Sequence, residues 1–176
     1  MKKYIFLLYA FLSLNLIAQI EDPVEWSFSV DSVSEDMRHL VIRADIEKGW
    51  NVYSQHVDPD GPVPTSFMFN QSSGYKLIGP VDESNTITKF DPVFQMELSS
   101  FQTKAVFKQK IQLLNDTLSV IKGELEFMVC NATMCLPPEY VDMIFNFKKK
   151  NKNSLKLEDS KFSINNKYII PTIDLE

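Results

Sequence analysis

Apolar and polar residues alternate along most of the chain, which is the period of a β-strand with one buried face. The segments that show this pattern, or form short apolar runs bounded by turn residues, are 24–30, 39–46, 51–54, 65–69, 75–78, 94–98, 105–113, 118–129 and 141–147. Pro, Gly, Asn and Asp separate them, and no segment keeps a helical period over three turns. The pattern therefore predicts an all-β fold, an antiparallel sandwich.

A turn signal, Asn115-Asp116, separates the two longest predicted strands, 105–113 and 118–129. Two alternating strands joined in this way are typical of a long hairpin. The second arm would then carry Cys130 to one end of the sandwich. Functional residues often lie at such loop ends.

The first 19 residues have the pattern of a secretory signal peptide. Lys2 and Lys3 precede an apolar stretch over residues 4–12, and Ala18 and Gln19 mark the expected cleavage region. The alternative is an uncleaved membrane anchor, but the apolar stretch is short for a spanning helix. We therefore expect an exported protein, with localisation in the periplasm.

Three regions follow from this organisation: the signal peptide (1–19), one β-domain (20–148) and a polar tail (149–176) that starts in a lysine-rich run. Removal of the leader would change the formal net charge from −5 to −7, which disfavours nucleic acid as a partner. Nothing after residue 20 is apolar for long enough to span a membrane, so we expect no transmembrane segment in the mature chain.

Cys130 and Cys135 are the two cysteines of the chain, and four residues separate them. An oxidising compartment permits a disulfide, and so small a loop would give it only about 2 kcal/mol of stabilisation. The pair has three readings: a redox-active disulfide, an inert staple across a turn, or a copper(I) site with Met128 and Met134. The spacing is not that of a thioredoxin motif, so attack by a more reactive partner thiol is the natural direction of exchange.

The sequence gives little support for a zinc site, a hydrolase site or a phosphate-binding site. His39 and His56 have no cysteine spacing typical of zinc, and His56 with Ser54 is no hydrolase signature. The chain contains five glycines and no phosphate-binding loop. We expect neither a cofactor nor a bound metal, with the copper(I) reading kept as an alternative.

The segment 127–138, Phe-Met-Val-Cys-Asn-Ala-Thr-Met-Cys-Leu-Pro-Pro, resembles the active-site segment of the N-terminal periplasmic domain of the thiol:disulfide interchange protein DsbD. That family has a strand, a cysteine pair four or five residues apart, an aromatic or apolar residue and Pro-Pro. Segments 49–54 and 61–67 are similar to a strand and the turn and strand after it, and 89–94 to a cap loop over the cysteines. The resemblance covers roughly residues 24–147.

The resemblance implies an immunoglobulin-like β-sandwich whose disulfide relays reducing equivalents. The implied donor is a thioredoxin-like protein or a membrane thiol reductase. The implied acceptors are a periplasmic disulfide isomerase or proteins of cytochrome maturation. In the full family protein a transmembrane domain and a thioredoxin-like domain follow, so a free-standing copy would receive its electrons in trans. The competing class is a non-catalytic binding module with a structural disulfide.

The resemblance also suggests residues around the cysteines. By the resemblance, Phe90 would lie over the disulfide and shield it. From the residues alone, Phe94 is expected in the core, and a core position is the alternative for Phe90 as well. Tyr53 is expected either in the core or lining the cysteine pocket, with a polar partner for its hydroxyl if buried. Glu139 is a surface charge or a modulator of the thiol pKa. Cys130 and Cys135 are the expected catalytic pair, and Cys135 the residue that the donor attacks.

Overall fold

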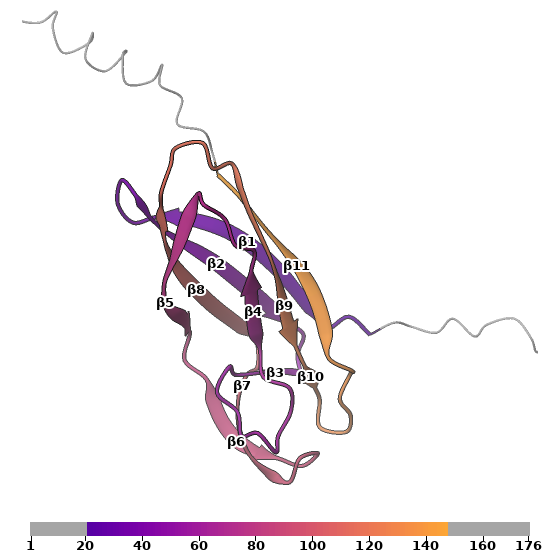
Figure 1. Ribbon diagram of the computed structural model, residues 1–176. Helices are drawn as coiled ribbons and strands as arrows, with labels where there is room; N and C mark the ends of the chain where they lie inside the picture. Colours follow the sequence, from indigo (N-terminus) through magenta and orange to yellow (C-terminus); the bar gives the residue numbers. More distant parts are fainter. Residues whose placement is uncertain (1–20, 148–176) are drawn as a thin grey trace, which may run out of the picture.

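The fold is described for residues 21–147 of a computed structural model, and this range contains strands but no helix (Figure 1). The strands are β1 (Val24–Ser32), β2 (Met37–Ile46), β3 (Asn51–Tyr53), β4 (Ser66–Phe69), β5 (Tyr75–Glu83), β6 (Ile87–Asp91), β7 (Met96–Phe101), β8 (Lys104–Leu113), β9 (Val120–Phe127), β10 (Val129–Cys130) and β11 (Glu139–Asn146). The predicted all-β fold is confirmed.

Two antiparallel sheets form the layers of the sandwich. One has the order β1-β2-β8-β5 and the other the order β11-β9-β4. Aromatic side chains from both sheets meet between them: the ring centroid of Phe107 lies 6.3 Å from that of Trp26 in its own sheet and 5.0 Å from that of Phe67 in the other. Phe101 of β7, which belongs to a third sheet, joins them, with its centroid 5.3 Å from that of Phe107. This main core accounts for most of the buried apolar side chains in the described range.

The sequence pattern explains which face of each strand is buried. In β9, Ile121, Leu125 and Phe127 are buried, while the alternate residues Lys122 and Glu124 are exposed. Side chains of a strand point to opposite faces in turn, so this spacing directs one face into the core. The buried position midway between Ile121 and Leu125 is Gly123. It is a glycine because a Cβ at this position would lie 2.5 Å from the backbone oxygen of Met68 in β4.

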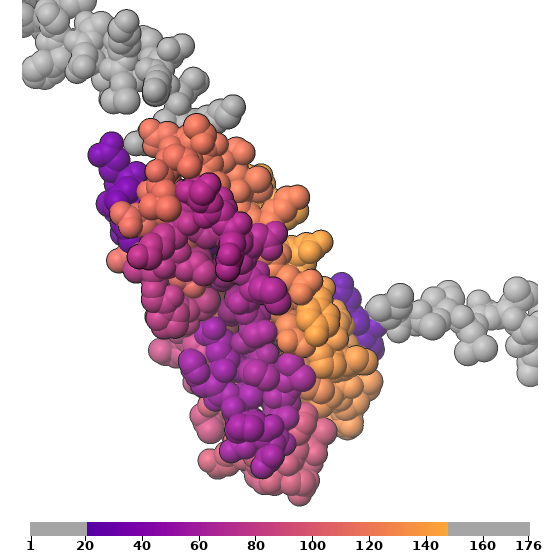
Figure 2. Space-filling model, in the orientation of Figure 1, coloured from indigo at the N-terminus to yellow at the C-terminus, as the bar shows by residue number. Residues whose placement is uncertain are grey.

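A third, smaller sheet continues the molecule beyond one end of the sandwich, with the order β10-β3-β7-β6 (Figure 1). In the space-filling view the pink β6–β7 region forms that extremity of the elongated body (Figure 2). Strand β6 was missed by the sequence analysis. Four of its five residues are exposed, so it has no alternation of buried and exposed positions to detect.

The predicted hairpin between residues 105–113 and 118–129 is wrong. Strand β8 pairs with β2 and β5, whereas β9 pairs with β11 and β4. The connection around Asn115-Asp116 crosses from one layer to the other, so the apolar faces of the two strands meet across the core. Periodicity shows which face of a strand is buried but not which strand pairs with it.

The predicted signal peptide (1–19) and tail (149–176) lie outside the described residues, as do the outer limits of the predicted domain (20–148). Within residues 21–147 there is no helix of the length and apolarity that a membrane crossing requires.

Candidate functional site

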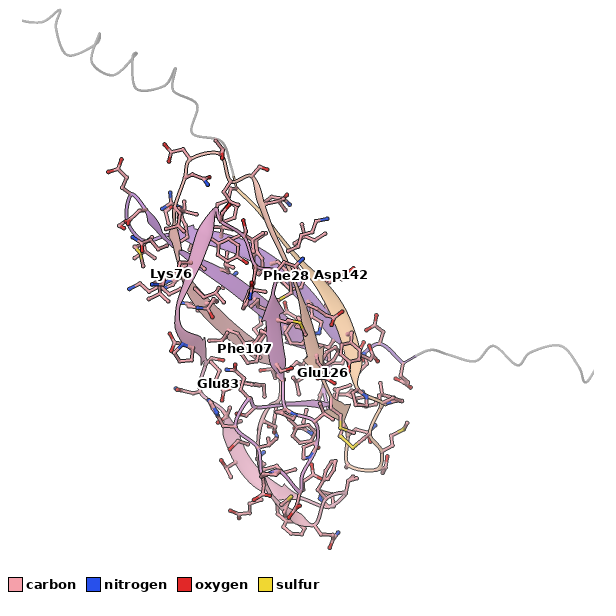
Figure 3. The ribbon with its side chains drawn as sticks, viewed as in Figure 1. Phe28, Lys76, Glu83, Phe107, Glu126 and Asp142 are labelled. Atoms are coloured by element: carbon pink, nitrogen blue, oxygen red, sulfur yellow. A yellow bond between two sulfur atoms is a disulfide. The ribbon has the colours of Figure 1, made fainter. Side chains whose placement is uncertain are left out.

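The cysteine pair lies in the small end sheet and forms a disulfide. Cys130 ends β10, where it pairs with Asn51 of β3, and Cys135 follows a four-residue turn. Their Cα atoms are 4.0 Å apart, and Figure 3 shows the yellow bond beyond the labelled Glu126. Cys130 is 0% exposed, whereas Cys135 is partly exposed. Of the two cysteines, Cys135 is therefore the more accessible.

Hydrogen bonds hold the turn between the cysteines independently of the disulfide. The Asn131 side-chain oxygen accepts bonds from the backbone N–H groups of Thr133 (2.9 Å) and Met134 (3.0 Å), and the Asn131 N–H donates to the Met134 carbonyl (2.9 Å). On the outer side, the N–H of Leu136 donates to the Val129 carbonyl (3.0 Å). The segment can therefore keep its shape when the disulfide is open.

A second, smaller apolar cluster surrounds the disulfide, and we call it the disulfide cluster. Its members are buried Tyr53, Leu98 and Cys130 and partly buried Val57, Phe94, Met96, Met128 and Cys135. These residues come from β3, β7, β10 and the loops beside them. The cluster is separate from the main core, so the disulfide lies in an apolar environment of its own, with Cys130 buried and Cys135 partly exposed.

Tyr53 is the largest fully buried side chain of the disulfide cluster, and it has the polar partner that burial requires. Its hydroxyl donates to the Asp91 carboxylate over 2.7 Å. Burial, and then the hydrogen bond and charge of Asp91, raise the pKa of Tyr53 far above its ordinary value. Tyr53 is therefore a neutral hydrogen-bond donor at any physiological pH.

Asp91 also organises the loop that follows β6. Its other carboxylate oxygen accepts bonds from the backbone N–H groups of Val93 (2.8 Å) and Phe94 (3.2 Å). The loop closes through a hydrogen bond from the N–H of Gln95 to the Asp91 carbonyl (2.9 Å). Gln95 itself has a left-handed backbone conformation (φ 58°). One carboxylate thus connects buried Tyr53 to the loop that carries Phe94 into the disulfide cluster.

The structure places Phe94, and not Phe90, among the residues packed with the cysteines. The Phe94 ring stands edge-on to Tyr53, with centroids 6.0 Å apart. Phe90 is 59% exposed and lies opposite Glu97 in the β6–β7 pair. Since Asp91 turns toward Tyr53, the adjacent Phe90 points to the other face of the strand.

Glu139 is the first residue of β11, where it pairs with Phe127 and is partly buried. Its carboxylate forms no salt bridge within residues 21–147. An effect of Glu139 on the pKa of the thiols therefore stays a prediction.

The geometry suits thiol–disulfide exchange with another protein. Cys135, the partly exposed cysteine, offers a point of attack, and the fully buried Cys130 can leave as the second thiol. Among the described residues no three His, Cys, Asp or Glu side chains are grouped as a metal site. Sequence reasoning missed Asp91 as an organising residue and Met96 as a member of the disulfide cluster. The Asp-Pro turn signal at residues 91–92 was the available hint.

A family model described as "Thiol:disulfide interchange protein DsbD, N-terminal" matches residues 18–146. No significant match was found among curated proteins. The N-terminal periplasmic domain of ScsB from Proteus mirabilis is structurally similar, with a TM-score of 0.57 and 11% identity over 83% of this chain and 55% of that one. This likeness and the family match confirm the predicted immunoglobulin-like fold.

Two structures from Neisseria meningitidis are also similar. The reduced DsbD N-terminal domain has a TM-score of 0.47 and 15% identity over 72% of this chain and 84% of that one. The complex between the DsbD and PilB N-terminal domains gives a TM-score of 0.49 and 16% identity over 74% of this chain and 88% of that one.

Proposed function

Because the chain belongs to the family of N-terminal domains of the thiol:disulfide interchange protein DsbD, we propose that it relays reducing equivalents through the Cys130–Cys135 disulfide. The donor is a thioredoxin-like dithiol, and the acceptors are disulfide-bearing proteins of the same extracytoplasmic compartment. The observation that carries this proposal is the unequal exposure of the pair: Cys135 is partly exposed and Cys130 is fully buried, in a cluster apart from the main core.

The reaction starts at Cys135. A donor thiolate attacks the Cys135 sulfur, the Cys130–Cys135 bond breaks, and Cys130 leaves as a thiolate that takes up a proton. The second donor thiol then attacks the donor's own sulfur in the mixed disulfide and releases Cys135. Two electrons and two protons have then reached this domain, and the donor carries the new disulfide. Transfer to an acceptor runs through the same steps in reverse, with Cys135 as the attacking thiol.

The surrounding residues control access to this reaction. Phe94 packs in the disulfide cluster against the ring of Tyr53, and the Asp91–Tyr53 hydrogen bond holds its loop in place. A small thiol must pass this loop, whereas a protein partner can displace it through a larger contact. Exposed apolar side chains of Val93 (42%) and Met134 (46%) lie in the cap loop and the cysteine turn, where a docking partner would cover them.

The proposed compartment and partners rest on the family. We place the chain in the periplasm, exported by residues 1–19, with a disulfide isomerase or cytochrome maturation proteins as acceptors. A membrane thiol reductase is the alternative donor.

Trapping of the mixed disulfide tests this function. In Cys130→Ser the accessible Cys135 thiol has no internal partner, so it should retain a thioredoxin-like protein as a mixed disulfide, resolved by non-reducing electrophoresis and mass spectrometry. Cys135→Ser, which keeps only the buried thiol, should trap much less, and the double Cys→Ser variant should trap nothing. If both single variants are folded and exported yet capture no thioredoxin-like protein, the disulfide is a structural staple.

A further inference from the structure

Backbone hydrogen bonds flank the cysteine pair on both sides. The two cysteines face each other as an isolated antiparallel bridge. Outside the pair, the N–H of Leu136 donates to the Val129 carbonyl (3.0 Å). Inside the turn, the N–H of Asn131 donates to the Met134 carbonyl (2.9 Å). Neither bond uses a cysteine sulfur, so both can persist after the disulfide is opened.

One side chain completes the turn between the cysteines. The Asn131 side-chain oxygen accepts hydrogen bonds from the backbone N–H of Thr133 (2.9 Å), from the hydroxyl of the same residue (2.9 Å) and from the backbone N–H of Met134 (3.0 Å). An Asn side chain that binds the backbone in this way substitutes for a backbone acceptor in a turn. Ala132, Thr133 and Met134 are exposed, so apolar burial contributes little to the shape of the turn. The shape therefore depends on the hydrogen bonds of Asn131.

These bonds matter most in the dithiol form. In the oxidised form the S–S bond keeps the cysteines together whether or not the turn is formed. After reduction, only non-covalent contacts oppose the chain entropy that separates the ends of the loop. The equilibrium constant for closing the disulfide is then lowered by the fraction of dithiol molecules in which the turn is open. A residue that holds the turn in the dithiol form therefore favours closure of the disulfide.

We propose that Asn131 is a positioning residue for exchange at the Cys130–Cys135 pair. Its side-chain oxygen keeps the turn formed in the dithiol, and so it sets the equilibrium constant and the rate with which the two sulfur atoms rejoin. The role of this step in a relay rests on the proposed function. The effect of Asn131 on the pair itself does not, because any small disulfide can oxidise the dithiol.

Asn131 acts on the second step of electron delivery. In the first step the Cys135 thiolate attacks one sulfur of the acceptor disulfide, and the other acceptor sulfur leaves as a thiolate. The Cys130 thiolate then attacks the Cys135 sulfur, which forms the internal disulfide and releases the remaining acceptor thiolate. The pair has then lost two electrons and two protons, and the acceptor has gained them as two thiols. A thiolate already held beside its target completes this second step faster.

A glutathione equilibrium tests the inference. The purified protein is equilibrated without oxygen in mixtures of reduced and oxidised glutathione, and its redox forms are separated after alkylation. Asn131→Ala should lower the equilibrium constant for disulfide formation about three- to tenfold, the effect of about one net hydrogen bond. This change corresponds to a potential less negative by about 15–30 mV. The mixed disulfide with glutathione should also persist longer, because its resolution is the step that Asn131 assists.

Asn115→Ala is the matched control. The Asn115 side-chain oxygen accepts the same pair of bonds, from the backbone N–H (3.2 Å) and the hydroxyl (2.9 Å) of Thr117. Asn115 precedes β9 and Asn131 follows it, so the length of that strand separates the two turns. The control variant should have the wild-type equilibrium constant. An equal fall in both variants would show a general effect of turn stability and would overturn the proposal.

Two further outcomes decide the role of the Asn131 oxygen. A merely structural residue would stabilise the oxidised and reduced forms alike, so an unchanged equilibrium constant in Asn131→Ala would overturn the proposal. Asn131→Asp keeps an acceptor oxygen and should restore the wild-type constant. It is measured at about pH 6, well below the ordinary thiol pKa of about 8.5, where the added charge meets few thiolates. An Asp variant as impaired as the Ala variant would contradict the assignment.

This equilibrium contains no protein partner, so its outcome is independent of the trapping experiment. Failure to trap a thioredoxin-like protein, with the predicted shift in Asn131→Ala, would reject the relay and keep the positioning role. Successful trapping with no shift would do the reverse.

Discussion

The main core and the disulfide cluster differ in size, in position and in proposed role. The main core lies between two sheets and joins side chains from most strands, with Phe107 in contact with three other aromatic rings. The disulfide cluster has three buried members, Tyr53, Leu98 and Cys130, and sits in short strands at one end. Buried apolar area stabilises a fold in proportion to its extent, so the main core should carry most of the stability.

This division lets the reactive end change without loss of the fold. The disulfide, its turn and the loop of Phe94 can alter while the sandwich stays intact. Regions with few buried contacts open at low free-energy cost, as binding and exchange require. The predictions below test whether the two regions are as separate as this account requires.

The largest effect is expected in the main core. Phe107→Ala removes a side chain that is 0% exposed and leaves a cavity between the sheets. The loss of stability should be about 3–5 kcal/mol, measured by urea unfolding. The rate at which dithiothreitol reduces the disulfide in the folded fraction should stay unchanged. A large change in that rate would show that the two regions are coupled.

Opening the disulfide should have the next largest effect. Cys130 and Cys135 close a loop of six residues, so the chain-entropy model gives the bond about 2 kcal/mol. The reduced protein should therefore unfold cooperatively, at a lower urea concentration than the oxidised protein. Loss of cooperative unfolding on reduction at room temperature would contradict the separation and favour a structural staple.

Tyr53→Phe should cost less, because it removes one hydrogen bond and keeps the ring. Loss of the bond to Asp91 should lower stability by about 1 kcal/mol. Reduction by dithiothreitol should become faster, since the loop of Phe94 loses its anchor. The matched control is Tyr140→Phe, because Tyr140 also bonds a carboxylate, Glu126 at 2.7 Å, but on the β9–β11 sheet. Equal reduction rates in the two variants would exclude a role for Tyr53 in shielding.

The smallest effect on stability is expected from Phe90→Ala, because that ring is 59% exposed. The change should stay within about 0.5 kcal/mol and should not affect reduction. Phe94→Ala is the contrasting variant and should speed reduction by dithiothreitol, because it uncovers the sulfur atoms. Faster reduction in Phe90→Ala, with no change in Phe94→Ala, would reverse the assignment of the shielding ring.

Much of the fold could be predicted because strands buried on one face leave an alternating pattern. The disulfide end was predictable from the two cysteines, and Tyr53 from the need of a buried hydroxyl for a partner. The strands with which β8 and β9 pair could not be predicted, because the pattern within one strand does not show which strand lies beside it. Phe90 was expected to be the shield and Phe94 a core residue. The sequence could not show which way Phe90 points, because exposed β6 has no alternation of buried and exposed positions.

The reduction potential of the Cys130–Cys135 pair tests the central claim most directly. It is measured on the purified protein by equilibration in glutathione or dithiothreitol buffers, with the oxidised and reduced fractions determined by thiol alkylation. A relay must exchange electrons with thioredoxin-like donors, so the potential should lie at roughly −180 to −270 mV. A value below about −300 mV would mark a bond that such donors cannot open, and would contradict the proposed function.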